Sequence, residues 1–193
     1  MNIAITGHLN GIGKSAFDKL SKNHKVKGFD ILEGYNIKKD KDKIIDETLD
    51  CNVFINNAFE GDGQLELAKT WHKVHFNNPG FFIINICSII AEYFLDNKNF
   101  LSENLQNDSS LQAYSNFKYD LYNYSKLINR SKSLCKSISL LPTWTDTRLM
   151  DNYKNIILKN KILSTDQVSE AIIYSIDSIK NNSFISTITL STP

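Results

Sequence analysis

Two tyrosines in the second half of the chain are each followed by a lysine four residues later. The pairs are Tyr114 with Lys118 and Tyr122 with Lys126. In a helix this spacing places both side chains of a pair on one face. An ammonium group beside a phenol favours the ionised phenolate, so either pair could exchange a proton with a bound reactant.

A glycine-rich segment near the N-terminus could bind phosphate. It reads Thr-Gly-His-Leu-Asn-Gly-Ile-Gly from Thr6 to Gly13, after a strand-like run and before a helix-like one. Glycines allow a tight turn and the close approach of a pyrophosphate, while the new helix offers free N–H groups and the positive end of its dipole. The segment therefore predicts a dinucleotide-binding turn.

A phosphate loop of the nucleoside triphosphatase type is the competing interpretation, because Gly13-Lys14-Ser15 matches the end of such a loop. That loop needs a glycine five positions before Gly13, where this sequence has His8. No later strand-like run ends in the aspartate that would hold magnesium. A kinase-like nucleotide binder is kept as a remote alternative.

Short strand-like runs alternate with helix-like segments, which predicts a Rossmann-type doubly wound α/β fold: a parallel sheet of six or seven strands with helices on both faces. Strands are expected at 2–6, 25–29, 52–56, 81–86, 136–141 and 184–190, and helices from about Gly11, Asp42, Gln64, Ala113 and Asp166. Ligands bind at the carboxyl ends of such strands. We expect one domain over 1–193, with the polar stretch 91–111 as an insertion loop.

In this order the motifs resemble the short-chain dehydrogenase/reductase family. The glycine-rich segment matches the branch with three residues between its first two glycines. The run Asn56-Asn57-Ala58 resembles the family's Asn-Asn-Ala-Gly turn, with Phe59 in place of the glycine. Ser88 follows the strand at 81–86 and stands where the family has its catalytic serine.

A later segment, Pro142 to Thr147, resembles the family's Pro-Gly-x-Val-x-Thr sequence beside the nicotinamide. Thr143 replaces the glycine and Thr145 replaces the valine. The family has an asparagine in its proton relay, for which this chain offers only Asn78 as a candidate.

The resemblance implies a catalytic set of Ser88, Tyr114 and Lys118. Tyr114-Ser115 resembles the family's Tyr-Ser start, and Tyr114 leaves room for a helix, a turn and a strand before Pro142, which Tyr122 does not. Tyr114 would exchange a proton with the substrate oxygen, Lys118 would bond the nicotinamide ribose, and Ser88 would orient the substrate. Tyr122 and Lys126 are then packing and surface residues.

The implied cofactor is NAD(H), with NADP(H) less favoured. Asp30 ends the second strand, where a carboxylate would accept hydrogen bonds from the adenosine ribose and repel a 2′-phosphate. The residues implied to contact the cofactor are Gly7, Asn10, Gly11, Ile12, Gly13, Asp30, Asn36, Ile37, Asn57, Ala58, Tyr114, Lys118, Pro142, Thr145 and Thr147.

The implied activity is hydride transfer between nicotinamide and a carbonyl or secondary alcohol of a small molecule. The alternative is a dinucleotide-binding sensor or assembly protein, because Phe59 and Thr143 replace glycines of the family. The resemblance also implies a homodimer or homotetramer, formed through the helices that begin near Gln64 and Ala113.

Composition narrows the remaining classes. The chain has 22 Lys and Arg against 21 Asp and Glu, so its net charge of +1 would recruit neither nucleic acid nor an anionic membrane. Cys51, Cys87 and Cys135 lie beside apolar runs, which is typical of small core residues and not of a disulfide or metal site. We see no signal peptide and no run of ~18 apolar residues, so we expect a cytoplasmic protein.

Overall fold

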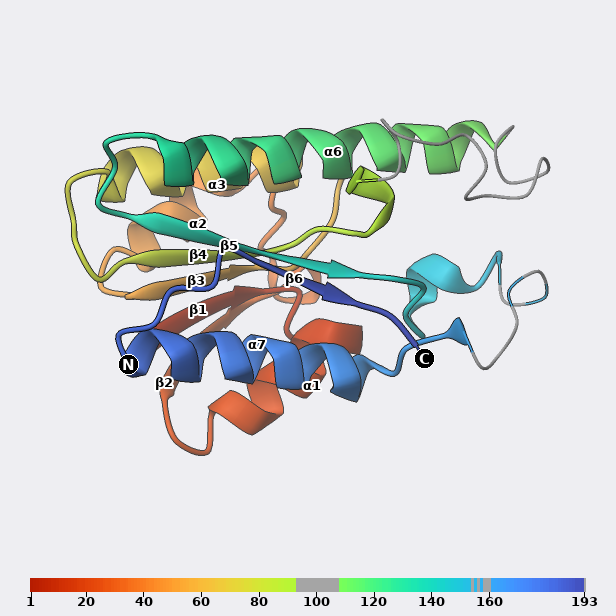
Figure 1. The fold of residues 1–193 in the computed structure, drawn as a ribbon, viewed down its shortest axis with the longest axis horizontal. Helices are drawn as coiled ribbons and strands as arrows, with labels where there is room; N and C mark the ends of the chain where they lie inside the picture. Colours follow the sequence, from red (N-terminus) through yellow and green to blue (C-terminus); the bar gives the residue numbers. More distant parts are fainter. Residues whose placement is uncertain (93–107, 154, 156, 158–160, 193) are drawn as a thin grey trace.

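Six parallel strands form one sheet in the computed structural model, which describes residues 1–92, 108–153, 155, 157 and 161–192 (Figure 1). The strands are β1 (Asn2–Thr6), β2 (Lys25–Phe29), β3 (Val53–Asn56), β4 (Phe82–Ile86), β5 (Lys136–Pro142) and β6 (Thr187–Leu190). Their order across the sheet is β2-β1-β3-β4-β5-β6. The predicted Rossmann-type fold is confirmed.

Helices cover both faces of the sheet. Helices α1 (Gly11–Leu20) and α7 (Thr165–Lys180) lie on one face, while α2 (Lys41–Glu47), α3 (Gly63–His75) and α6 (Ser109–Arg130) lie on the other (Figure 1). Side chains of a strand alternate between these layers: Ile3 and Ile5 pack with α1 and α7, whereas Ala4 packs with the opposite layer. Burial on both faces explains why the four central strands are so apolar, whereas the edge strands β2 and β6 are only partly buried.

The direction in which successive strands are added to the sheet changes at β1, which pairs with β2 on one side and β3 on the other. After β2 the chain crosses over β1 to reach β3, and the later strands extend the sheet on that side. Such a switch point leaves a crevice at the carboxyl ends of the strands. The glycine turn, the turn after β3 and Ser88 all follow strands at this edge.

Helix α6 begins earlier than the predicted Ala113 because Asp108 caps it. The Asp108 Oδ1 atom accepts hydrogen bonds from Ser110 N at 2.8 Å and Leu111 N at 3.0 Å. The predicted insertion loop is therefore shorter at this end, and residues 90–92 at its other end are helical as well. The remainder, 93–107, lies outside the described residues.

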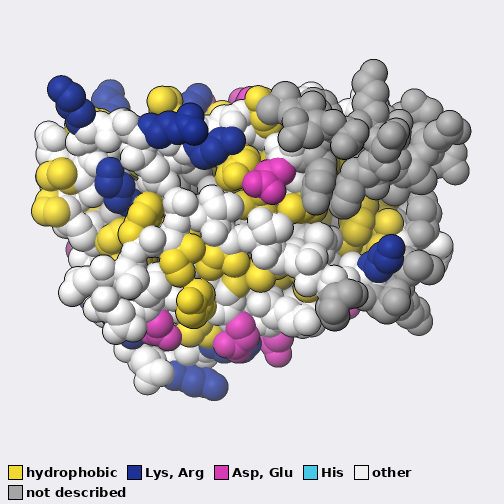
Figure 2. Space-filling model, in the orientation of Figure 1, with side chains coloured by type: hydrophobic (Ala, Val, Ile, Leu, Met, Phe, Trp, Pro, Cys, Tyr) yellow, Lys and Arg dark blue, Asp and Glu magenta, His cyan; other side chains and the backbone are white. Residues whose placement is uncertain are grey.

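The three cysteines are buried and free, as predicted for core residues. Burial raises the pKa of Cys51 to about 11 and that of Cys87 and Cys135 to about 12. No described helix is both long and apolar enough to cross a membrane. On the face shown in Figure 2, most Lys and Arg side chains lie toward the upper left, most Asp and Glu side chains lie along the lower edge, and apolar side chains run across the middle.

Two buried histidines of α3 should make stability depend on pH. His72 Nδ1 lies 2.9 Å from the Tyr124 hydroxyl, and the His75 ring stacks on Phe81 with centroids 4.4 Å apart. Burial lowers the pKa of both histidines below 6.5. Below pH 6.5 the unfolded chain binds a proton at each histidine, whereas the folded chain does so only at lower pH. The free energy of unfolding should therefore fall by up to about 1.4 kcal/mol per pH unit for each histidine.

Urea unfolding between pH 8 and pH 5 measures this dependence. The His75→Phe variant keeps an aromatic ring but removes one titrating group, so its stability should fall less steeply below pH 6.5. Equal slopes for the variant and the parent chain would contradict the assignment to His75.

Candidate active site

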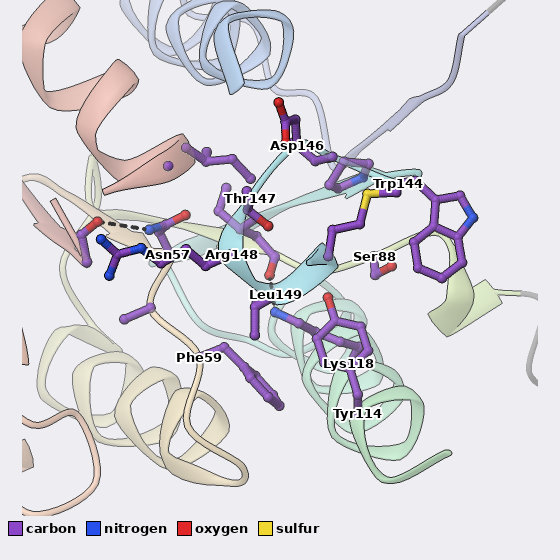
Figure 3. Close-up of a pocket in the computed structure, with 18 of the residues that line it drawn as sticks. Asn57, Phe59, Ser88, Tyr114, Lys118, Trp144, Asp146, Thr147, Arg148 and Leu149 are labelled. Atoms are coloured by element: carbon purple, nitrogen blue, oxygen red, sulfur yellow. Dashed lines mark hydrogen bonds between the residues drawn. The ribbon is translucent and has the colours of Figure 1, made fainter. Parts of the chain in front are cut away.

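A cavity of about 960 Å³ opens at the carboxyl ends of the strands (Figure 3). It is lined by the turns after β1, β3, β4 and β5 and by one side of α6. Most of the predicted site residues line it: Gly7, Asn10, Gly11, Ile12, Asp30, Asn57, Ala58, Ser88, Tyr114, Lys118, Pro142, Thr145 and Thr147. The fold thus brings together residues from nearly the whole length of the chain.

The glycine turn leaves the start of α1 open to this cavity. Gly7 and Gly11 have positive φ angles of 72° and 55°, which glycine adopts without strain. Gly13 does not line the cavity; a Cβ atom there would collide with the Gly7 carbonyl, so this glycine lets helix and turn pack closely. The N-cap residue Asn10 makes no side-chain capping bond, and the first turn has no acidic residue. The free N–H groups suit an anion.

Asp30 is buried at the same end of the cavity. Its Oδ2 atom accepts a hydrogen bond from Leu9 N at 3.3 Å, and its Oδ1 atom accepts one from Leu32 N at 3.0 Å. The second bond caps a short 3₁₀ helix, η1 (Ile31–Glu33). The carboxylate is therefore held between the glycine turn and η1, and each oxygen keeps a second lone pair for a ligand.

Asn36 and Ile37, which are predicted to contact the cofactor, do not line the cavity. The Asn36 Oδ1 atom accepts hydrogen bonds from the backbone of Lys38 and Lys39, both at 2.9 Å. Ile37 is buried in the core that α2 and α3 form with the sheet. The Asn36 Oδ1 atom therefore stabilises the local turn, and Ile37 contributes to the core.

The turn after β3 is tied to β1. The Thr6 hydroxyl oxygen accepts hydrogen bonds from the backbone of Asn57 and Ala58, each at 3.0 Å, and Asn57 Nδ2 donates to the Thr6 carbonyl at 2.9 Å. Phe59, which replaces a glycine of the family turn, packs edge-on against Tyr114 with centroids 4.9 Å apart. The sequence treats Phe59 as a departure from the motif, whereas in the structure it lines the site.

Tyr114 and Lys118 of α6 face the cavity together (Figure 3). Lys118 is 3% exposed, and its Nζ atom donates to Gln64 Oε1 and to the Ile86 carbonyl, both at 2.7 Å. Burial without a carboxylate partner lowers the pKa of Lys118 to about 8. Burial also raises the pKa of Tyr114, an effect that a side-chain hydrogen bond with Ser88 partly opposes.

The second pair, Tyr122 and Lys126, lies outside this cavity. The Tyr122 hydroxyl donates to Glu92 Oε1 at 2.8 Å, and Lys126 Nζ lies 4.2 Å from the centre of the Tyr122 ring. These contacts are structural, whereas Tyr114 and Lys118 line the cavity.

Comparison with known proteins rests on structure, because no protein-family model and no curated protein matches the sequence. A 3-ketoacyl-(acyl-carrier-protein) reductase from Brucella melitensis, solved with NADH, matches with a TM-score of 0.74 at 17% identity, over 98% of this chain and 96% of that one. The 3-alpha-hydroxysteroid dehydrogenase of Pseudomonas sp. B-0831, also with NADH, matches with a TM-score of 0.73 at 17% identity, over 98% and 95%.

A short chain dehydrogenase from Burkholderia cenocepacia J2315, solved with NADP, gives a TM-score of 0.72 at 14% identity, over 98% of this chain and 87% of that one. This chain has the short-chain dehydrogenase fold. Since the matched structures hold either NADH or NADP, the fold alone leaves the choice of cofactor open.

Within this short-chain dehydrogenase fold, Gln64 is a site residue that the sequence analysis missed. Its Nε2 atom donates to the Asn56 carbonyl at 2.7 Å and to the Ile86 carbonyl at 3.2 Å, so its Oε1 atom must face Lys118. Asn78, the predicted relay candidate, lies between α3 and the amino end of β4, where its Nδ2 atom is 3.2 Å from His75 Nδ1. It is remote from Lys118.

Two different substitutions of Gln64 should shift the pKa of Lys118 in opposite directions. Gln64→Leu removes an acceptor and should lower that pKa below about 8, whereas Gln64→Glu places a carboxylate beside the ammonium and should raise it by about 1 to 3 units. An NMR titration of the lysine side chain, assigned with Lys118→Arg, measures both shifts. The same midpoint in the two variants would show that Gln64 does not govern the ammonium.

Proposed function

We propose that the chain is an NAD(H)-dependent oxidoreductase that transfers a hydride between nicotinamide and a carbonyl or secondary alcohol of a small molecule. One observation carries this proposal: Ser88, Tyr114 and Lys118 line the same cavity as the glycine turn and Asp30. A protein that only binds a dinucleotide has no need of an acid–base pair in that cavity. When bound, the cofactor supplies the hydride itself.

Tyr114 acts as the proton donor in the reducing direction. Its raised pKa keeps the phenol protonated at neutral pH, so a proton is available for the substrate oxygen. Lys118 is largely charged below pH 8, and its charge stabilises the phenolate that forms when the proton leaves. Ser88 donates a hydrogen bond to the substrate oxygen, and Phe59 shields the pair from water.

The end of the cavity near Tyr114 suits a substrate that carries an apolar group beside its carbonyl or alcohol carbon. Tyr114 belongs to a cluster of apolar and aromatic side chains, of which Ile90, Leu111, Trp144 and Tyr153 also line the cavity. Such a lining favours desolvated, uncharged portions of a substrate.

Binding and turnover are tested separately. Titration with NADH and NADPH, followed by fluorescence, should show saturable binding, and a panel of carbonyl compounds and secondary alcohols should then include a substrate. Binding without any turnover across a broad panel would favour the sensor or assembly protein. Absence of binding to either dinucleotide would refute the proposal as a whole.

We also propose a homodimer or homotetramer built on α3 and α6. Among the apolar side chains of α6, Leu121 and Tyr122 are buried in the core, while Leu127 is 61% exposed. Leu127 lies in a shallow hollow with Leu65 and Tyr124 between the two helices. This exposed leucine therefore becomes the residue to test.

Light scattering at micromolar concentration should report a mass above that of the monomer. Leu127→Glu should move the mass toward the monomer because it replaces an exposed apolar side chain with a charge that the interface would have to desolvate. Tyr174→Glu, on the opposite helix layer and equally exposed at 62%, is the matched control and should have no effect. A monomeric parent chain would remove the proposal.

A further inference from the structure

The glycine turn contributes no positively charged side chain to the end of the cavity where the cofactor phosphates are proposed to bind. None of the residues from Gly7 to Gly13 is Lys or Arg. The first basic residue after the turn, Lys14, is bound to Asp18 at 2.7 Å on the exposed side of α1 and does not line the cavity. Among the described lining residues the basic ones are Lys118 and Arg148, and Lys118 is bonded to Gln64 and Ile86.

Arg148 begins a short 3₁₀ helix, η2 (Arg148–Met150), that lies against the glycine turn. The preceding residue, Thr147, is close enough that a Cβ atom on Gly11 would lie 3.4 Å from its methyl group. Figure 3 shows the Arg148 side chain extended across the cavity toward Asn57 and away from Ser88 and Tyr114. Within the described part of the chain, its guanidinium forms no ion pair or hydrogen bond.

We propose that Arg148 binds the pyrophosphate of the dinucleotide, opposite the free N–H groups at the start of α1. This inference rests on the proposed function. A guanidinium presents its donors in a planar fork that matches two phosphate oxygens, so it completes an anion site that the uncapped helix provides only in part. The direction of the side chain argues against a role at the substrate, because the reacting groups lie on the other side of the cavity.

The adenosine 2′-phosphate is the other phosphate that Arg148 could meet, and Asp30 argues against it. The Asp30 carboxylate lines the cavity where the adenosine ribose is proposed to bind, so a 2′-phosphate there would face a negative charge. The pyrophosphate carries no such conflict. In this proposal, Thr147 and Arg148 of the segment after β5 contact the middle of the cofactor, where the pyrophosphate lies.

Titration of Arg148→Gln with NADH, NADPH and ADP-ribose tests the proposal. ADP-ribose has the pyrophosphate but no nicotinamide, so its affinity should fall by the same factor as that of NADH, about tenfold or more, as expected when a charge-assisted hydrogen bond is lost. The affinity of the parent chain for NADH should also weaken more steeply with salt than that of the variant. Arg130 is the other arginine of the sequence, and Arg130→Gln is the control that should leave all three affinities unchanged.

Each other result has a distinct meaning. Unchanged affinity of Arg148→Gln for both NADH and ADP-ribose would overturn the proposal while leaving the proposed function intact. A loss confined to NADPH would assign Arg148 to the 2′-phosphate and overturn it as well. If the parent chain binds no dinucleotide at all, the proposed function itself fails.

Discussion

Replacing Tyr114 by phenylalanine should lower turnover by ~10²-fold or more, as expected for the loss of a general acid. The substitution keeps the ring that packs on Phe59 and removes only the hydroxyl. The affinity for NADH should therefore stay close to that of the parent chain, so the loss should appear in kcat. Steady-state kinetics on the substrate found by the carbonyl panel, together with an NADH titration, measure both quantities.

Tyr122→Phe is the matched control because it makes the same chemical change on the same helix. Tyr122 lies two helical turns further along, about 12 Å at 1.5 Å per residue, and its hydroxyl is bonded to Glu92 outside the cavity. Turnover should change little. If Tyr122→Phe were the inactive variant and Tyr114→Phe active, the choice between the two pairs would be wrong.

The order of strands and helices could be predicted from the sequence because each apolar run and each capping residue acts locally. The capping box of α7, in which Ser164 and Gln167 bond each other's backbone, is such a signal. The Asp108 side chain caps α6 without such a reciprocal bond, and it lies in a polar stretch with weak periodicity. The sequence therefore predicts the start of α6 at Ala113, four residues later than Ser109, where the helix begins.

The contacts inside the site were harder to predict because they join distant parts of the chain. Gln64 and Lys118 are 54 positions apart, and nothing in either local sequence indicates that an amide will meet the ammonium. A helix-like segment that begins a few residues after the Asn-Asn-Ala turn is the one available signal for Gln64. Conversely, Asn36 and Ile37 are predicted to contact the cofactor, but Asn36 is bonded within its local turn and Ile37 is packed in the core, and neither lines the cavity.

Selectivity for NADH over NADPH is the second large effect that we expect, and Asp30 is its source. The carboxylate is buried, held by two backbone N–H groups and unable to turn away from a ligand. A 2′-phosphate beside it would face like-charge repulsion, which costs several kcal/mol. NADH should therefore bind ~10²-fold more tightly than NADPH. Equal or reversed affinities in parallel titrations would contradict this assignment.

Asp30→Asn removes the charge while keeping a side-chain oxygen to cap η1. The variant should gain affinity for NADPH because the repulsion is lost, and it should bind NADH somewhat more weakly because a neutral amide is a poorer acceptor for the ribose hydroxyls. Glu33→Gln is the control: Glu33 lies on the same short helix but its side chain is 47% exposed, so solvent screens its charge. A rise in NADPH affinity in the Glu33 variant as large as that in the Asp30 variant would mean that the general negative charge of η1, and not the buried carboxylate, selects the cofactor.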